Sequence, residues 1–292
     1  AIVSDPQYHW ADYPKGVLLE LQKKGIPFGG SRAVISSNLP TGSGISSSAA
    51  LETATAYFVK ALYPFEKEKM AIAKLCQRAE NQFVGMPCGI LDQFSSIFGQ
   101  KNAFLFLDCD TLEHQAYPVA EPPSIVLCDS MVKHKLVEGE YKSRRQQCES
   151  AARTMAERLG RSVRFLRDIT LKEFQSLEDI LSLQERKRAG HVMFENQRVL
   201  VGTRALENGD LHRLGDMMTQ SHESSRTKFE NTCKELDLLV EEAIQLPGCF
   251  GSRMTGGGFG GCTVSLVEPS AVEAVVATMK ERSKERLGAE SR

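Results

Sequence analysis

Apolar positions recur at helical spacing through much of the chain. Val17, Leu18 and Leu21 lie among charged residues and predict an amphipathic helix over residues 13–24. The same pattern predicts further helices over residues 49–62, 66–83, 90–98, 143–159, 188–208, 210–222, 233–246 and 272–286. Short apolar or β-branched runs predict strands at residues 33–36, 103–107, 124–128 and 262–267. Helices and strands that alternate in this way indicate an α/β or α+β protein with two lobes.

The best linker candidate is the Pro122-Pro123 pair, which follows Glu121. Proline lacks a backbone N–H and continues neither a helix nor a central strand. We therefore predict one lobe over residues 1–122 and a second over residues 123–292.

Composition narrows the classes of function. The formal net charge of the 292-residue chain is −1, without the basic excess of a nucleic-acid-binding protein. No apolar run approaches the roughly 20 residues that span a bilayer, and no signal peptide precedes the first helix. No two of the eight cysteines have Cys-x-x-Cys spacing, so we expect free thiols in a reducing cytoplasm. We expect a cytoplasmic monomer with no membrane partner.

A glycine- and serine-rich segment at residues 40–49 (PTGSGISSSA) separates a predicted strand from a predicted helix. Glycine lets the backbone approach a ligand closely, and the N–H groups at a helix N-terminus attract anions. Serine hydroxyls add oxygen ligands of the kind that Mg²⁺ prefers. The segment lacks the Gly-Lys-Ser/Thr of a P-loop, so a flexible surface turn remains the alternative to a phosphate site.

A second glycine-rich loop covers residues 256–261 (GGGFGG). It formally contains G-x-G-x-x-G, but a β-branched strand follows it instead of a helix, so we reject a dinucleotide-binding site. Each ordered glycine costs roughly 0.5–1 kcal/mol relative to alanine. We expect close packing against a ligand or another loop to explain this cost.

Two acids flank a sharp turn at residues 85–89 (GMPCG), and both have apolar neighbours. Glu80 is a candidate ligand for Mg²⁺, and Asp92 is a candidate group to orient or deprotonate a hydroxyl. A positioned general base contributes roughly 10²–10⁴ in rate. A solvated acid on a helix surface is the alternative for either residue alone.

These segments together resemble a known family. Residues 40–49 resemble the ATP motif of the GHMP kinase superfamily. Residues 252–262 (SRMTGGGFGGC) and 85–94 (GMPCGILDQF) are similar to the motifs of its galactokinases, as are Trp10-Ala11-Asp12-Tyr13, Glu140-Tyr141, Arg144-Arg145 and Cys148. The resemblance covers nearly the whole chain. It implies an α+β fold of two lobes: a ribosomal-protein-S-five-like N-terminal α/β lobe that binds ATP, and a ferredoxin-like C-terminal lobe.

The resemblance also implies roles for individual residues. Asp92 matches the catalytic base, which would act on the anomeric hydroxyl of galactose to give galactose 1-phosphate and ADP. Ser48 and Glu80 match ligands of Mg²⁺. Matches to sugar contacts are Gly89, Asp92 and Tyr141, and matches to ATP contacts are Trp10, Gly42, Gly44, Ser46, Ser47 and Ser48.

The chain lacks the Gly-Glu-His-Thr-Asp motif with which galactokinases begin, together with the arginine that precedes it. It also ends shortly before the final strand of the family, so we expect a partial sequence. In the family, residues of the absent motif contact the sugar and determine which sugar binds. Kinases of N-acetylgalactosamine and of arabinose therefore stay alternatives. A non-catalytic sensor that binds galactose and ATP is the alternative from a different class.

Overall fold

The computed structural model describes residues 2–39, 44–132 and 137–287. Contacts between residues divide the chain into two compact units, Ala1–Ala120 and Glu121–Arg292, and each is described by itself. Both units combine helices with a small antiparallel sheet, which confirms the α+β class predicted from the sequence. Among the described residues no helix has the length and apolar character required to cross a membrane.

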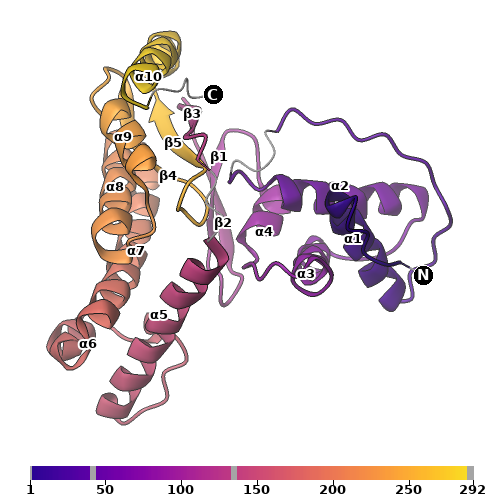
Figure 1. The fold of residues 1–292 in the computed structure, drawn as a ribbon, viewed down its shortest axis with the longest axis horizontal. Helices are drawn as coiled ribbons and strands as arrows, with labels where there is room; N and C mark the ends of the chain where they lie inside the picture. The colour runs from indigo at the N-terminus through magenta and orange to yellow at the C-terminus, as the bar shows by residue number, and fades with distance from the viewer. Residues whose placement is uncertain (1, 40–43, 133–136, 288–292) are drawn as a thin grey trace. The chain divides into compact units, whose positions relative to one another are not determined.

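The described residues of the first unit form helices, two short helical turns and a hairpin of two strands (Figure 1). A 3₁₀ turn, η1 (His9–Ala11), leads into α1 (Asp12–Lys23), as the sequence pattern predicts. The remaining elements are α2 (Ser47–Leu62), α3 (Lys69–Ala79), α4 (Leu91–Phe98), β1 (Ala103–Leu107) and β2 (His114–Pro118). The two strands pair antiparallel from Ala103 opposite Pro118 to Leu107 opposite His114.

Buried apolar side chains from these helices form one core. Val17 and Leu21 of α1 pack with Ile72 of α3 and Phe94 of α4, and all four side chains are at most 2% exposed. These positions recur every three or four residues in each helix, so one face of each helix points inward. The core thereby sets the positions of α2, α3 and α4, which carry most of the candidate site.

The helix predicted over residues 66–83 differs from the observed one at both ends. The helix begins only at Lys69, because Glu68 has the extended conformation of an N-cap residue. After Ala79 the backbone continues as a π-helical turn, η2 (Glu80–Val84). The N–H of Gly85 closes this turn on the carbonyl oxygen of Glu80 at 3.0 Å, and the positive φ of Gly85 (84°) ends it.

The strand predicted at residues 33–36 is wrong. The described structure has no strand there, and Val34 and Ile35 are 98% and 55% exposed. A β-branched run forms a strand only where another strand supplies hydrogen-bond partners, and none pairs with it among the described residues. The pattern also missed β2 and β4 (Cys249–Met254), whose compositions are mixed.

The second unit contains a three-stranded antiparallel sheet with the order β3-β5-β4. The sheet consists of β4, β3 (Ser124–Asp129) and β5 (Cys262–Val267), the last two close to their predicted bounds. The helices of this unit are α5 (Val137–Leu159), α6 (Leu171–Leu177), α7 (Leu183–Glu207), α8 (Leu211–Ser224), α9 (Lys234–Ala243) and α10 (Val272–Leu287).

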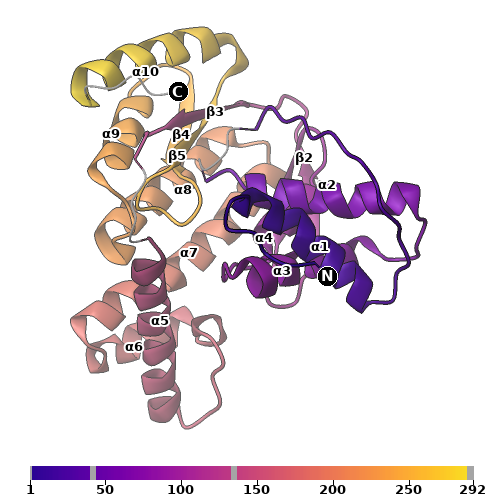
Figure 2. The same ribbon diagram turned by 45° about the vertical axis from the view of Figure 1, so that its right-hand side comes forward.

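Helices α9 and α10 cover one face of this sheet (Figure 2). Val126 and Cys128 of β3 pack with Leu239 of α9 and with Val275 and Met279 of α10, and all five side chains are buried. A separate buried cluster joins α5, α6 and α7. The sheet core fixes the ends of β4 and β5, between which the second glycine-rich loop runs.

Helix α8 lies along the outer edge of β4. The hydroxyl oxygen of Thr219 accepts a hydrogen bond from the N–H of Ser252 (3.4 Å), and Nδ1 of His222 accepts one from the N–H of Met254 (3.3 Å). These side chains replace the strand that would otherwise pair with β4. The edge is therefore covered, which blocks pairing with another chain.

Candidate functional site

Helix α2 begins directly after the first glycine-rich segment. Gly44 has a positive φ of 71°, and Ser46, the N-cap residue, is left-handed (φ 61°, ψ 34°). The carbonyl of Ser46 accepts the first helical hydrogen bond, from the N–H of Ala50 at 3.0 Å. Ser47 and Ser48 therefore occupy the first turn, where helical N–H groups lack intrahelical acceptors and attract anions. Gly42 lies outside the described residues.

Glu52 lies four residues after Ser48, on the same face of α2. Its side chain is fully buried, and its Oε2 accepts a hydrogen bond from Nε2 of Gln93 at 3.0 Å. Gln93 belongs to the first turn of α4 and is also fully buried. This hydrogen bond connects the second turn of α2 to the first turn of α4.

Glu80 opens the π-helical turn after α3 and is 6% exposed. Its Oε2 accepts a hydrogen bond from the same Nε2 of Gln93 at 2.6 Å, and a second one from the thiol of Cys88 at 3.4 Å. One amide nitrogen thus bridges two buried carboxyl groups. The hydrogen bonds from Gln93 and Cys88 both use Oε2 of Glu80.

The electrostatics of this cluster follow from burial and from like charge. Burial, followed by the negative charges of Glu80 and Asp92, raises the pKa of Glu52 to about 8, although the hydrogen bond from Gln93 opposes this shift. Glu52 is therefore mostly protonated at neutral pH. Burial and the charge of Glu80 raise the pKa of the Cys88 thiol to about 12, so this thiol stays protonated and donates.

The turn between η2 and α4 is held by the side chain of Asn81. Its Oδ1 accepts from the N–H of Cys88 at 2.7 Å, and its Nδ2 donates to the carbonyl of Cys88 at 3.3 Å. Gln77 donates to the same carbonyl at 3.3 Å. The turn leaves Gly89 exposed, with nothing within 4 Å of the position that a Cβ would take. Asp92 follows, partly exposed, in the first turn of α4.

Trp10 and Tyr141 belong to other parts of the chain. Trp10 lies in η1 and is 56% exposed. Tyr141 is a residue of α5 in the second unit, and its side chain lies outside the described residues. The structure therefore brings Ser48, Glu80 and Asp92 onto neighbouring helical elements of one unit, while Tyr141 belongs to the other.

The second glycine-rich loop packs against its own unit. The N–H of Phe259 donates to the carbonyl of Asn231 at 2.7 Å, and Nδ2 of Asn231 donates to the carbonyl of Gly257 at 3.1 Å. A Cβ on Gly258 would overlap the carbonyl of Asn231, and one on Gly260 would overlap that of Val132. Of the two explanations expected from the sequence, packing against a ligand or against another loop, the second accounts for these two glycines, because other backbone lies where a side chain would be.

Sequence reasoning missed Glu52 and Gln93. Glu52 is four residues from Ser48 and is surrounded by Ala49, Ala54 and Ala56, so helical spacing combined with an apolar context was an available signal. Gln93 directly follows Asp92, and nothing in the sequence distinguishes it from a surface amide. Its burial depends on tertiary packing between α2, η2 and α4.

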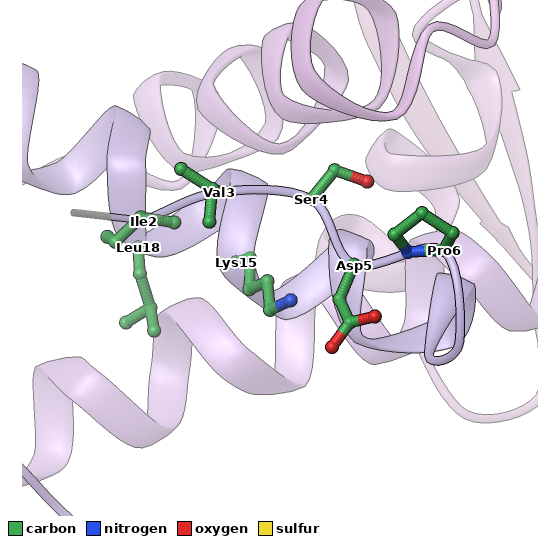
Figure 3. Close-up of a pocket in the computed structure, with 7 residues that line it drawn as sticks. All are labelled: Ile2, Val3, Ser4, Asp5, Pro6, Lys15 and Leu18. Carbon is green, nitrogen blue, oxygen red and sulfur yellow. The ribbon is translucent and has the colours of Figure 1, made fainter.

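Two hollows lie apart from this cluster. The first, of about 490 Å³, is lined by residues 2–6 and by Lys15 and Leu18 of α1, and its lining contains none of the predicted site residues (Figure 3). The second, of about 650 Å³, lies between α5 and the start of α7 in the second unit, with polar residues such as Gln147 and Ser182 in its lining. Neither hollow adds a residue to the site.

Comparison with known proteins identifies the family. The model of the GHMP kinases N terminal domain matches residues 12–100, and that of the GHMP kinases C terminal matches residues 203–285. The chain is 43% identical to a galactokinase of Bos taurus over 94% of its length and 68% of the relative. It is 44% identical to a galactokinase of Homo sapiens over 93% of its length and 68% of the relative.

A solved structure agrees with these sequence matches. The crystal structure of Lactococcus lactis galactokinase complexed with galactose matches with a TM-score of 0.88 and 32% identity. This match covers 97% of the chain and 73% of the solved chain. The two-lobed GHMP kinase fold that the motifs predict is thereby confirmed. The chain belongs to the galactokinases, within the GHMP kinases.

Proposed function

We propose that the protein transfers a phosphoryl group from ATP to the anomeric hydroxyl of galactose, which gives galactose 1-phosphate and ADP. The observation that carries this proposal is the placement of Ser48, Glu80 and Asp92 on neighbouring helical elements, in a chain 43–44% identical to galactokinases. The Lactococcus lactis relative was crystallised with galactose, which supports this sugar.

Each residue has a proposed role that matches its chemistry. Asp92 is the partly exposed carboxylate that orients the sugar hydroxyl and accepts its proton. The start of α2, with Gly42, Gly44, Ser46, Ser47 and Ser48, presents backbone N–H groups to the phosphates of ATP. The exposed ring of Trp10 stacks on the adenine, and Gly89 and Tyr141 contact the sugar.

The donor set fits Mg²⁺. The Ser48 hydroxyl and the Glu80 carboxylate would supply oxygen ligands, which a hard cation prefers. The described residues hold no cluster of three or more Asp, Glu, His or Cys side chains that could bind a metal alone. Ser48 and Glu80 would hold Mg²⁺, which when bound would supply positive charge beside the phosphate oxygens of ATP.

Three alternatives are separated by their products. Kinases of N-acetylgalactosamine or arabinose release ADP with those sugars instead of galactose. A sensor binds galactose and ATP, and gains thermal stability from them, without releasing ADP.

We also propose that the protein is a cytoplasmic monomer and that the boundary between its two lobes lies between residues 122 and 123.

The test is Mg²⁺-dependent release of ADP by the 292-residue chain, with galactose, N-acetylgalactosamine and arabinose in parallel. Asp92→Asn is the matched variant, because it keeps the shape of the side chain and removes the base. Galactose-dependent release that Asp92→Asn reduces at least 10²-fold is the expected result. No ADP with any of the sugars, together with thermal stabilisation by ATP and galactose, would contradict the proposal in favour of a sensor.

A further inference from the structure

We infer that Gln93 is a positioning residue of the kinase site, whose side-chain amide ties Glu80 to Glu52 and so holds the proposed metal-binding carboxylate in place against helix α2. The inference rests on the proposed function, because it assigns a purpose to the position of Glu80. Gln93 acts through Glu80 and itself contacts neither substrate nor metal.

The geometry of the tie is specific. Nε2 of Gln93 lies 2.6 Å from Oε2 of Glu80 and 3.0 Å from Oε2 of Glu52. An amide –NH₂ carries two hydrogens, so one nitrogen satisfies both acceptors. Gln93 and Glu52 are fully buried and Glu80 is 6% exposed, so water does not compete for these hydrogen bonds. A buried hydrogen bond to a charged acceptor is stronger than a neutral one.

The tie joins the two elements that carry the proposed metal ligands. Glu52 lies on the same face of α2 as Ser48, one turn further along. Glu80 opens the π-helical turn η2, a less regular backbone than the α-helix before it. Without Gln93, the position of the Glu80 carboxylate relative to Ser48 would depend on this turn and on the weak thiol donor of Cys88.

Asp92 directly precedes Gln93 in the first turn of α4, so this turn carries both the proposed base and the positioning residue. Asp92 is partly exposed, whereas Gln93 is fully buried. Consecutive helical residues point about 100° apart, so one turn presents an acid outward and an amide donor inward. The same backbone therefore positions the proposed base and, through Gln93, the proposed metal ligand.

The hydrogen bonds to both Glu52 and Glu80 require the length and the two N–H donors of a glutamine side chain. Glutamate would place a third carboxyl group beside Glu52 and Glu80 and would lose both N–H donors. Asparagine is one methylene shorter and reaches at most one of the two acceptors. Methionine fills a similar volume and donates nothing, so Gln93→Met removes the tie with little change in packing.

The test measures metal binding directly. Mn²⁺ is titrated into the 292-residue chain in the presence of a non-hydrolysable ATP analogue, and free Mn²⁺ is read by electron paramagnetic resonance. We expect Gln93→Met and Gln93→Asn each to raise the Kd of Mn²⁺ about tenfold per folded molecule, while the KM for galactose changes less than twofold. Gln100→Met, at an exposed glutamine two residues after α4, is the control and leaves both values unchanged.

The outcomes separate the inference from the function on which it rests. Tight Mn²⁺ binding by both Gln93 variants, with a wild-type Kd, would overturn the inference and leave the kinase proposal intact. A wild-type chain that binds no Mn²⁺ with the analogue would overturn both. An equal loss of Mn²⁺ and galactose binding would show a general structural effect and would also overturn the positioning role.

Discussion

Gly215 of α8 and Gly251 of β4 lie backbone against backbone. A Cβ on Gly215 would overlap the carbonyl of Phe250, and one on Gly251 would overlap the carbonyl of Gly215. Only the absence of a side chain on both residues lets α8 approach the edge of the sheet. We expect Gly215→Ala to lower the free energy of unfolding by about 2–4 kcal/mol, because the overlap involves backbone that cannot rotate away. Urea denaturation followed by circular dichroism measures this change.

The matched control for this substitution is Gly139→Ala in α5 of the same unit. No atom lies within 4 Å of the position of its Cβ, and its backbone is helical with a negative φ. Alanine is favoured over glycine in such a helix by about 0.5–1 kcal/mol, so this variant should be neutral or more stable. A Gly215→Ala variant as stable as Gly139→Ala would contradict the close packing of α8 and β4.

Glu52 should make stability depend on pH near neutrality. Burial raises its pKa to about 8 in the folded protein, from a model-peptide value near 4.5. Between these values the folded chain holds a proton that the unfolded chain releases, so the free energy of unfolding falls as the pH rises from 4.5 to 8. Glu52→Gln keeps the acceptor for Gln93 and removes this cost, and should stabilise the protein by about 2–4 kcal/mol at pH 8. Chemical denaturation at pH 5 and pH 8 checks both the sign and the window.

His191 should make the protein sensitive to acid. Burial lowers its pKa to about 4, assisted by the charges of Arg198 and Arg253 and opposed by that of Glu195. Between pH 6.5 and pH 4 the unfolded chain binds a proton that the folded chain does not, so stability falls as the pH drops through this window. His191→Gln should reduce this loss by about 1–3 kcal/mol. Thermal unfolding at pH 7 and pH 5 gives the comparison, and parallel slopes for both proteins would contradict the assignment.

Arg188 should anchor the segment that supports the second glycine-rich loop. Its side chain is 2% exposed, and it donates to Gln147, to Gln184, to the carbonyl of Lys228 and to the carboxylate of Glu230. Hydrogen bonds from Lys187 and Arg188 lower the pKa of Glu230 to about 2. We expect Arg188→Met to cost about 2–4 kcal/mol, since it removes a buried guanidinium whose four hydrogen bonds, one of them to a carboxylate, connect α5, α7 and the segment at residues 228–230.

A surface arginine of the same unit supplies the control for Arg188. Arg145 is 66% exposed and pairs with Glu149 at 2.8 Å, an ion pair in solvent. Such pairs contribute about 0–1 kcal/mol, so Arg145→Met should change stability little. Equal effects of the two substitutions on the urea midpoint would show that burial of Arg188 contributes nothing.

The helices were predictable from sequence because their apolar positions recur with helical spacing, as Val17 and Leu21 do in α1. Strands depended on partners that the sequence does not identify. Val34 and Ile35 have strand composition and remain exposed without a partner, whereas β4 forms although Gly251 and Arg253 interrupt its apolar pattern. The hydrogen bonds from β5 and the cover from α8 decide that β4 is a strand.

The candidate site divides in a similar way. Ser48, Glu80 and Asp92 were selected from motifs and local context, and their roles remain predictions. Glu52 and Gln93 could not be selected, because a single acid or amide in a helix has the same sequence pattern whether it faces solvent or a buried acceptor. Only the packing of α2, η2 and α4 makes this distinction.

The π-helical turn at Glu80–Val84 constrains how this region can change in length during evolution. A π turn holds one residue more than the α-helical turn that it replaces, so deleting one residue would convert it to regular α-helix. Residues beyond the turn would keep their direction around the axis, because a π turn and an α turn each complete one full rotation, whereas a deletion within α3 would rotate every later residue by about 100°. Single-residue gaps in functional homologues should therefore fall at exposed positions of this turn such as Gln82, and not within α3 or at Asn81, whose side chain holds Cys88.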